Sequence, residues 1–250
     1  MKKFLFALLS VALFSCSSDS NSEPEPPVNT DVFIRGADMS YLPLIESEGT
    51  LYKHNGTNQD PIITLKNAGC NAIRIRLWQN PSDGHSGMAE VKTFAQRVKA
   101  AGLKVWLTVH YSDTWADPAH QTKPVAWQSL TFSNLKTAVT DYTNLVMTEI
   151  NPDIIQIGNE TNDGMLWPEG KLSTNESQYL ELVTAASAAI RSKSTTTKIM
   201  LHHGGLSGSD WFFSKVANID YDYIGLSYYP IWHGTSLLTF QNTMNSLGQL

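Results

Sequence analysis

Residues 153–160 read DIIQIGNE, an apolar run of strand character that ends in an amide and a carboxylic acid. Side-chain alternation along a strand predicts that Glu160 lies on the same face as Gln156. Asn159 then falls on the opposite face, with Ile157. In parallel α/β barrels the catalytic side chains lie at the carboxyl ends of the strands. A lone Asn-Glu pair is also common as a helix cap or a surface ion pair, so the neighbouring sequence decides its interpretation.

Short apolar runs of this kind alternate with helical patterns from residue 31 onward, which is typical of parallel βα units. Six units are visible, with strands predicted at residues 33–42, 71–78, 103–111, 153–160, 197–203 and 221–230. Helices are predicted at residues 60–69, 91–101, 131–150, 177–193, 210–217 and from 236 onward. The fold class is therefore α/β, and we expect a barrel domain over residues 31–250.

Length and charge narrow the range of functions. A chain of 250 residues with 42% hydrophobic content can bury one large core, which fits one α/β barrel or two small domains. The formal net charge is −5. Without Lys2 and Lys3 it becomes −7, because 16 basic residues then face 23 acidic ones. No basic surface for a phosphate backbone is expected, so we predict no nucleic-acid partner and a neutral substrate.

The amino terminus has the pattern of an export signal. Two lysines precede an apolar stretch over residues 4–14, which is too short to span a membrane. The stretch ends in Leu-Phe-Ser-Cys at residues 13–16, which resembles a bacterial lipobox. We predict a lipoprotein signal peptide at residues 1–15 and a lipidated Cys16. An ordinary secretory signal with a chance cysteine is the alternative.

Residues 16–30 would then form a flexible acidic tether rich in proline. The expected location is the cell surface or the periplasm, as an outer-membrane lipoprotein of a Gram-negative bacterium. Only Cys70 remains after Cys16, so no disulfide framework and no thiolate metal site are expected.

Several well-known motifs are absent from the sequence. The first strand ends in Gly36-Ala37-Asp38 without the GxGxxG spacing, and no GxxxxGK[ST] occurs, which argues against nucleotide binding. Residues 205–209 read GLSGS and do not fit the GxSxG turn of esterases. His202 and His203 are adjacent in a strand and point to opposite faces, so they cannot share one metal ion. No metal site is predicted.

The predicted strand ends share polar and aromatic side chains that would gather at one mouth of a barrel. These residues are Asp38, Arg76, Trp78, His110, Tyr111, Asp113, Trp115, Asn159, Glu160, Trp167, His202, His203, Tyr228, Tyr229, Trp232 and His233. A single tryptophan at such a place is as often part of the core. Four of the seven tryptophans in one mouth, beside carboxylates, indicate a sugar-binding site, because flat rings stack on the apolar faces of sugars.

Five segments carry a resemblance to a known family, at residues 35–42 (RGADMSYL), 74–81 (RIRLWQNP), 110–127 (HYSDTWADPAHQTKPVAW), 156–160 (QIGNE) and 225–234 (GLSYYPIWHG). The chain resembles the endo-β-1,4-galactanases of glycoside hydrolase family 53. The resemblance implies an eight-stranded (β/α) TIM barrel, of which this chain would hold the first six βα units. It also implies secretion and hydrolysis of the β-1,4-galactan side chains of pectin.

The resemblance assigns roles to matching residues. Glu160 corresponds to the general acid/base, and Asn159 to the residue that hydrogen-bonds the substrate 2-hydroxyl. Arg76 corresponds to an arginine near the nucleophile, although Arg76 and Asp113 fit ion-pair scaffolding as well. The predicted substrate-binding residues are Asp38, Arg76, Trp78, His110, Asp113, Trp115, Asn159, Tyr229, Trp232 and His233.

The implied mechanism is retaining hydrolysis by two carboxylates about 5–5.5 Å apart. The family nucleophile is a Glu at the end of the seventh strand, and no Glu follows Glu181 in this chain. We therefore expect a chain truncated at its carboxyl end, with roughly 70 to 80 further residues in the complete barrel. No cofactor is expected in this chain, and the resemblance implies calcium in some members, in loops near the last strands.

The expected partners are a β-1,4-galactan substrate and the outer membrane through the lipid anchor, and we expect a monomer. Two alternatives stay open. One is a surface lipoprotein that binds galactan without cleaving it. The other is a related hydrolase that acts on mannan or glucan.

Overall fold

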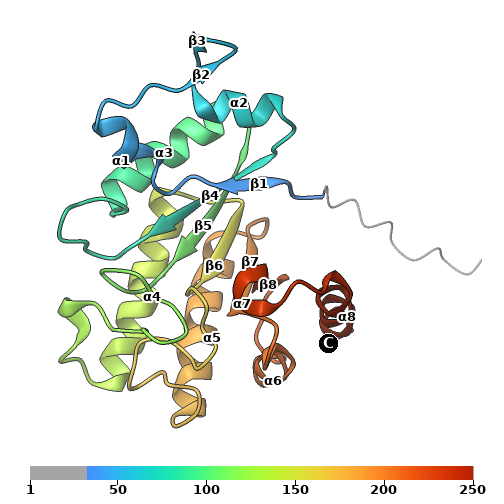
Figure 1. Cartoon of the computed structure of the whole chain (residues 1–250). Coiled ribbons are helices and arrows are strands. Elements are labelled where there is room, and N and C mark those ends of the chain that lie inside the picture. Colours follow the sequence, from blue (N-terminus) through green and yellow to red (C-terminus); the bar gives the residue numbers. More distant parts are fainter. Residues whose placement is uncertain (1–32, 250) are drawn as a thin grey trace, which may run out of the picture. The chain divides into compact units, whose positions relative to one another are not determined.

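Six parallel strands, joined in chain order, form the main sheet of the computed structural model, which describes residues 33–249 (Figure 1). They are β1 (Gly36–Asp38), β4 (Ala72–Leu77), β5 (Lys104–Val109), β6 (Ile154–Ile157), β7 (Lys198–Gly204) and β8 (Tyr223–Ser227). The sheet curls into part of a (β/α) barrel, with β1 and β8 as its edge strands. All six predicted strands are confirmed; β7 has the predicted length, shifted by one residue, and the other five are shorter than predicted. The predicted signal peptide, Cys16 and tether lie outside the described residues.

Helices connect these strands. The longer ones are α3 (Met88–Ala100), α4 (Phe132–Glu149), α5 (Glu176–Lys193) and α8 (Leu237–Leu247). The shorter ones are α1 (Leu42–Ser47), α2 (Pro61–Asn67), η1 (Val125–Trp127), α6 (Ser209–Lys215) and α7 (Pro230–His233). The six predicted helices are confirmed. The pattern missed α1, η1, α7 and the small hairpin of β2 (Lys53–His54) and β3 (Thr57–Asn58), which are too short to show a period.

Local sequence explains where several helices begin and end. Asp60 caps α2 by accepting a hydrogen bond from the Ile62 N–H at 2.8 Å, and Pro61 occupies the first turn. Thr131 caps α4 by accepting from the Asn134 N–H. Gly102 follows the end of α3 with a φ of 76°. These signals are local, so the helices between the strands can be predicted from sequence.

The core lies between the sheet and the helices. Ile73, Ile75 and Leu77 of β4 are at most 1% exposed, and they belong to one apolar cluster with Phe94 and Val98 of α3. Each such side chain contributes about 1.5–3 kcal/mol by leaving water. The alternate residues of the strands include Arg74, Arg76, Trp106, Gln156 and His202, which lie on the other face of the sheet. No helix among residues 33–249 is both long and apolar enough to cross a membrane.

The loop between β6 and α5 folds back on itself. Gly164 and Lys171 form an isolated antiparallel bridge, and the Met165 N–H donates to the Gly170 carbonyl at 3.0 Å. The backbones approach so closely that a Cβ on Gly164 would lie 1.9 Å from the Gly170 carbonyl oxygen. Gly164 has a φ of 88°, which also favours glycine.

Candidate functional site

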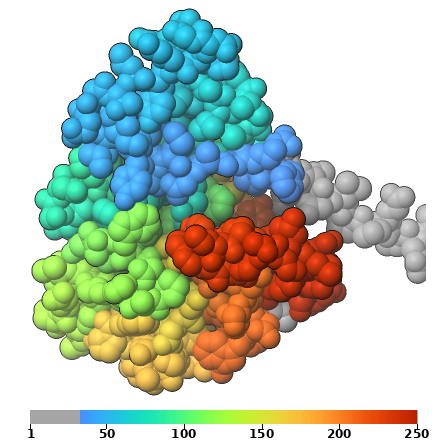
Figure 2. Space-filling view, in the orientation of Figure 1, coloured from blue at the N-terminus to red at the C-terminus, as the bar shows by residue number. Residues whose placement is uncertain are grey.

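A cavity of about 660 Å³ opens at the carboxyl ends of the six strands. In Figure 2 the N-terminal part of the described chain (blue), the segment after β5 (green) and the C-terminal segment (red) adjoin on one face. The cavity is lined by Asp38, Tyr41, Arg74, Arg76, Trp106, Trp115, Ala116, Asp117, Asn159, Glu160, His202, Gly225, Leu226, Ser227, Tyr228, Tyr229 and Trp232. Segments far apart in the sequence therefore meet in one site.

Seven of the eleven predicted site residues line this cavity, namely Asp38, Arg76, Trp115, Asn159, Glu160, Tyr229 and Trp232. The other four do not line it and instead contact neighbouring side chains or loop backbone, as described below: Trp78, His110, Asp113 and His233. The roles predicted for all eleven in substrate binding or catalysis stay predictions.

Asn159 lies on the inner side of the curled sheet, and the face predicted for it was wrong. Strand β6 ends at Ile157, and Gly158 has a φ of 73°, so the strand alternation stops before Asn159. The Asn159 amide donates to the Ala116 carbonyl at 2.8 Å, and its Oδ1 accepts from Arg74 at 3.0 Å. Glu160 also has a positive φ, of 47°. Glycine tolerates such an angle, whereas the left-handed conformation of Glu160 needs support from its neighbours.

Arg74 connects the cavity residues, and the sequence analysis missed it. Its Nη1 lies 2.6 Å from Asp38 Oδ2, and its Nη2 donates to Asn159 at 3.0 Å and to Gln156 Oε1 at 3.3 Å. Arg74 and Arg76 are two residues apart in β4 and share the inner face, so the RIR spacing was the available signal. Arg74 fixes the orientation of the Asn159 amide.

Arg76 lies among three aromatic rings. Its guanidinium carbon is 4.5, 4.2 and 4.4 Å from the ring centres of Tyr41, Trp78 and Trp115. Nε and Nη2 both donate to Ser86 Oγ, at 3.1 and 2.8 Å, and the residue is 3% exposed. Arg76 makes no ion pair with any carboxylate among the described residues. Cation–π contacts of this kind are worth about 0.5–2 kcal/mol each.

Trp78 and His110 lie behind Trp115, at most 9% exposed. The His110 ring is 5.6 Å from that of Trp115, and its Nδ1 accepts a hydrogen bond from the Ala116 N–H at 3.1 Å. Burial, together with the positive charges of Arg74 and other neighbours, holds the pKa of His110 well below its ordinary value. A neutral His110 is thus an acceptor that orders the loop after β5.

Asp113 and His233 order loops around the cavity. Asp113 accepts from the Asn80 N–H at 3.0 Å and from the Val125 N–H at 2.8 Å, which joins the loops after β4 and β5. His233 Nδ1 accepts from the Tyr229 N–H at 2.9 Å. His233 thus orders the backbone of Tyr229, which lines the cavity, whereas Asp113 orders loop residues outside the cavity lining.

Four aromatic side chains are exposed at the cavity, which is unusual for rings of this size. Tyr41 is 47%, Trp115 46%, Tyr229 48% and Trp232 73% exposed. Tyr229 and Trp232 lie edge to face, with ring centres 5.1 Å apart. Exposed rings beside polar groups suit the apolar faces and hydroxyl groups of a sugar.

His202 lies in the inner wall, whereas His203 faces the helices, as their adjacency predicts. The His203 ring packs 5.5 Å from Phe212 of α6. His202 Nδ1 accepts from the Glu160 N–H at 3.0 Å and is 3.1 Å from Gln156 Nε2. Burial, and then the charges of Arg74 and His203, lowers the pKa of His202 to about 3. His202 is therefore neutral at ordinary pH.

The low pKa of His202 makes the stability of the fold depend on pH. An unfolded histidine has a pKa of about 6.5, so between about pH 6.5 and 3 the unfolded state binds a proton that the folded state excludes. The free energy of unfolding must then fall as the pH falls. The stability difference between wild type and His202→Asn should shrink by about 2 kcal/mol between pH 6.5 and 5. Urea denaturation at both pH values measures it, and a constant difference would contradict a neutral, buried His202.

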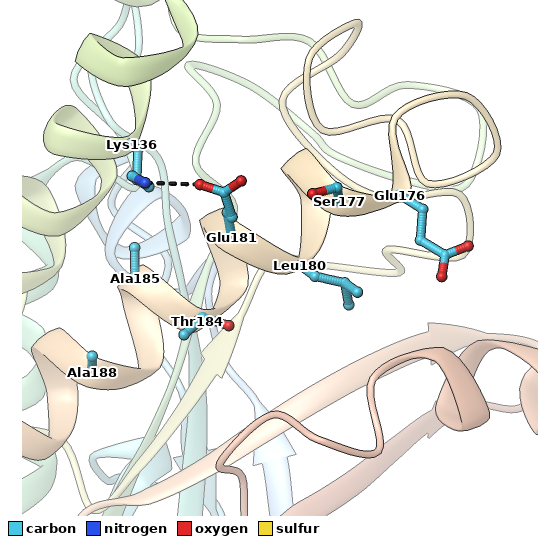
Figure 3. A pocket seen from close by; sticks show the side chains of 8 residues that line it. All are labelled: Lys136, Glu176, Ser177, Leu180, Glu181, Thr184, Ala185 and Ala188. Atoms are coloured by element: carbon cyan, nitrogen blue, oxygen red, sulfur yellow. Dashed lines mark hydrogen bonds and ion pairs between the residues drawn. The ribbon is translucent and has the colours of Figure 1, made fainter.

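A second hollow, of about 790 Å³, lies on the outer face of α5 (Figure 3). Its lining comes from α5 except for Lys136 of α4, which pairs with Glu181 at 2.8 Å. The hollow is formed largely by short side chains, such as Ala185 and Ala188, and it is not at the strand ends. Among residues 33–249 no group of three or more His, Cys, Asp or Glu side chains is placed to hold a metal ion.

The curled parallel sheet and the polar, aromatic cavity at its strand ends place the chain among the (β/α)-barrel enzymes. A comparison with family profiles matches residues 34–249 to glycosyl hydrolase family 53. The chain belongs to this family.

Individual relatives agree with this assignment. The chain is 38% identical over 229 residues to a probable arabinogalactan endo-beta-1,4-galactanase A of Aspergillus fumigatus. That match covers 84% of this chain and 64% of the relative, so the chain spans less than two thirds of its length.

Two solved structures are also similar. The GH53 catalytic domain of Ignisphaera aggregans has a TM-score of 0.83 at 36% identity, covering 90% of this chain and 66% of that chain. A structure from a study of two fungal beta-1,4-galactanases has a TM-score of 0.81 at 34% identity, covering 88% and 71%. The predicted barrel fold is thereby confirmed.

Proposed function

We propose that the protein to which this chain belongs hydrolyses β-1,4-galactosidic bonds within arabinogalactan, the side chains of pectin. The observation that carries the proposal is the position of Glu160 and Asn159 in a cavity flanked by exposed Trp115, Tyr229 and Trp232. Support comes from relatives named as arabinogalactan endo-beta-1,4-galactanases and from membership of glycosyl hydrolase family 53.

The proposed mechanism is retaining. Glu160 protonates the glycosidic oxygen as the sugar leaves and later removes a proton from the attacking water. Asn159, oriented by Arg74, hydrogen-bonds the 2-hydroxyl of the sugar at the point of cleavage. Such a hydrogen bond strengthens as the oxocarbenium-like transition state forms, so it lowers the barrier rather than only tightening binding.

The nucleophile of this mechanism is a second carboxylate, and we assign it to no described residue. Asp38 lines the cavity, but its oxygens already accept from Arg74 at 2.6 Å and from the Ser40 hydroxyl at 2.6 Å. Asp117 accepts from the backbone N–H groups of Ala119 and His120. We therefore assign neither carboxylate the role of nucleophile.

Substrate comparison tests the proposed activity. Protein purified from the native host is incubated with β-1,4-galactan, β-mannan and β-glucan, and the new reducing ends are measured. Cleavage of galactan alone, to mixed oligosaccharides, is expected. Cleavage of mannan or glucan instead would move the protein to a related specificity, and galactan binding without cleavage would make it a binding protein.

We also propose that the protein is an outer-membrane lipoprotein anchored through Cys16, which the lipobox-like residues 13–16 support. Cys16→Ala should move the protein from the membrane fraction to the soluble fraction, because the lipid chains supply the membrane affinity. Immunoblots of the two fractions measure this. Cys70→Ala serves as the matched control and should leave the protein in the membrane fraction. Retention of the Cys16 variant there would refute the anchor.

A further inference from the structure

The peptide group between Asn159 and Glu160 is held on both sides by side chains. On its N–H side, Glu160 donates to His202 Nδ1 at 3.0 Å. On its carbonyl side, Asn159 O accepts from Gln121 Nε2 at 2.8 Å. His202 is 6% exposed and Gln121 2% exposed, so water does not compete for either hydrogen bond. We call these two residues the peptide clamp.

The residues after Glu160 are tied to β7 as well. The Thr161 N–H donates to the His202 carbonyl at 3.0 Å. The Asn162 side chain and the backbone of Gly204 exchange two hydrogen bonds, each of 2.7 Å. The chain beyond β6 thus continues its pairing with β7, partly through side chains.

Backbone conformation explains why this support matters. Glu160 has a φ of 47°, in the left-handed region that costs a residue with a side chain about 1 kcal/mol or more. The space for its carboxyl group comes from Gly204, where a Cβ would lie 3.0 Å from Glu160 Cδ. Without the clamp the peptide group could turn, and the carboxyl group would move with it.

The hydrogen bonds also define the tautomer of His202. Its Nδ1 faces two N–H donors, Glu160 N and Gln156 Nε2, so it carries no proton. The proton is then on Nε2, 3.1 Å from Ser227 Oγ, which accepts it. If Nδ1 carried a proton, it would be a donor facing two other donors, and neither hydrogen bond could form. The charges that lower the pKa of this ring are those of Arg74, from β4, and of the adjacent His203.

We propose that His202 and Gln121 are positioning residues, which hold the Asn159–Glu160 peptide so that the Glu160 carboxyl group meets the oxygen of the leaving sugar. This inference rests on the proposed galactan hydrolysis. The competing view is that both are only satisfied polar groups of the core. That view predicts a loss of stability and no dependence on the leaving group.

The test uses three variants of the protein as its host makes it. His202→Leu removes the acceptor. His202→Asn keeps one, because Oδ1 of Asn occupies nearly the place of Nδ1. His203→Leu is the control, since it changes the adjacent buried histidine on the helix-facing side. Each variant is assayed by kcat/KM on β-1,4-galactan and on a dinitrophenyl β-galactobioside, whose leaving group needs no proton.

His202→Leu should lower kcat/KM on galactan by about 10²-fold, the cost of a misplaced general acid. It should lower kcat/KM on the dinitrophenyl substrate far less. His202→Asn should recover most of the loss, and His203→Leu should change neither value. Equal losses on both substrates, or an Asn variant as poor as the Leu variant, would overturn the inference. So would full activity of His202→Leu on galactan.

Amide hydrogen exchange gives a readout that does not need activity. The Glu160 amide should be protected in wild type and in His202→Asn, and it should exchange faster in His202→Leu. Unchanged protection in the Leu variant would overturn the clamp. If wild type leaves galactan intact while this exchange pattern holds, the proposed substrate fails and the clamp stands.

Discussion

Glu160→Gln should lower the rate of galactan hydrolysis by about 10³-fold or more, because an amide can neither donate the proton to the leaving oxygen nor accept one from water. The change keeps the size of the side chain. The Glu160 N–H bond to His202 is made by the backbone and is unaffected. The variant should therefore fold normally and still bind galactan. Initial rates on β-1,4-galactan and affinity electrophoresis in galactan gels measure the two properties.

Glu181→Gln is the matched control for this prediction. Glu181 lies on α5 beside Lys136, in the hollow drawn in Figure 3, away from the strand-end cavity. Loss of an exposed ion pair costs at most about 1 kcal/mol, so activity should be unchanged. Wild-type rates in Glu160→Gln would remove Glu160 from the mechanism. Loss of binding together with activity would point to a structural role instead.

Gly164→Ala should destabilise the fold by about 4 kcal/mol or more, which is large for one methyl group. The new Cβ would lie 1.9 Å from the Gly170 carbonyl oxygen and 2.7 Å from the Leu172 nitrogen. Both are backbone atoms, so the β6–α5 loop would have to open. The positive φ adds a further, smaller cost.

Gly208→Ala separates the two causes. Gly208 has a φ of 79°, and a Cβ there would meet no atom within 4 Å. This variant should therefore lose only the conformational cost, about 1 kcal/mol. Urea denaturation of both variants gives the comparison. Similar losses at the two positions would mean that the loop accommodates the methyl group and that the close approach is not rigid.

The helices could be predicted because turn and capping residues stand at their ends. The strands could be predicted because apolar side chains run along them. Glu160 was found for the same reason, since it stands where such a run ends. Asn159 was placed on the wrong face because the positive φ of Gly158 interrupts the alternation, and a glycine in a strand pattern allows such an angle without requiring it. The alternation of side chains between the two faces holds only as far as the strand extends.

Other parts of the site depend on contacts between distant segments. The RIR pattern puts Arg74 and Arg76 on one face, but it cannot tell that Arg74 reaches Asn159 while Arg76 is enclosed by rings. The bond from Gln121 to the Asn159 carbonyl joins loops 38 residues apart in the chain. Only the folded barrel brings these groups within hydrogen-bond distance.

The order of strands in the sheet has a consequence for how the molecule assembles. The strands lie side by side in the sheet in the same order as in the chain. From β4 onward, each strand therefore pairs with the one made before it. A chain leaving the ribosome or an export channel with its amino terminus first could thus extend its sheet one crossover at a time. Until the next strand arrives, the newest one presents a free row of backbone donors and acceptors, which is the stage most open to aggregation.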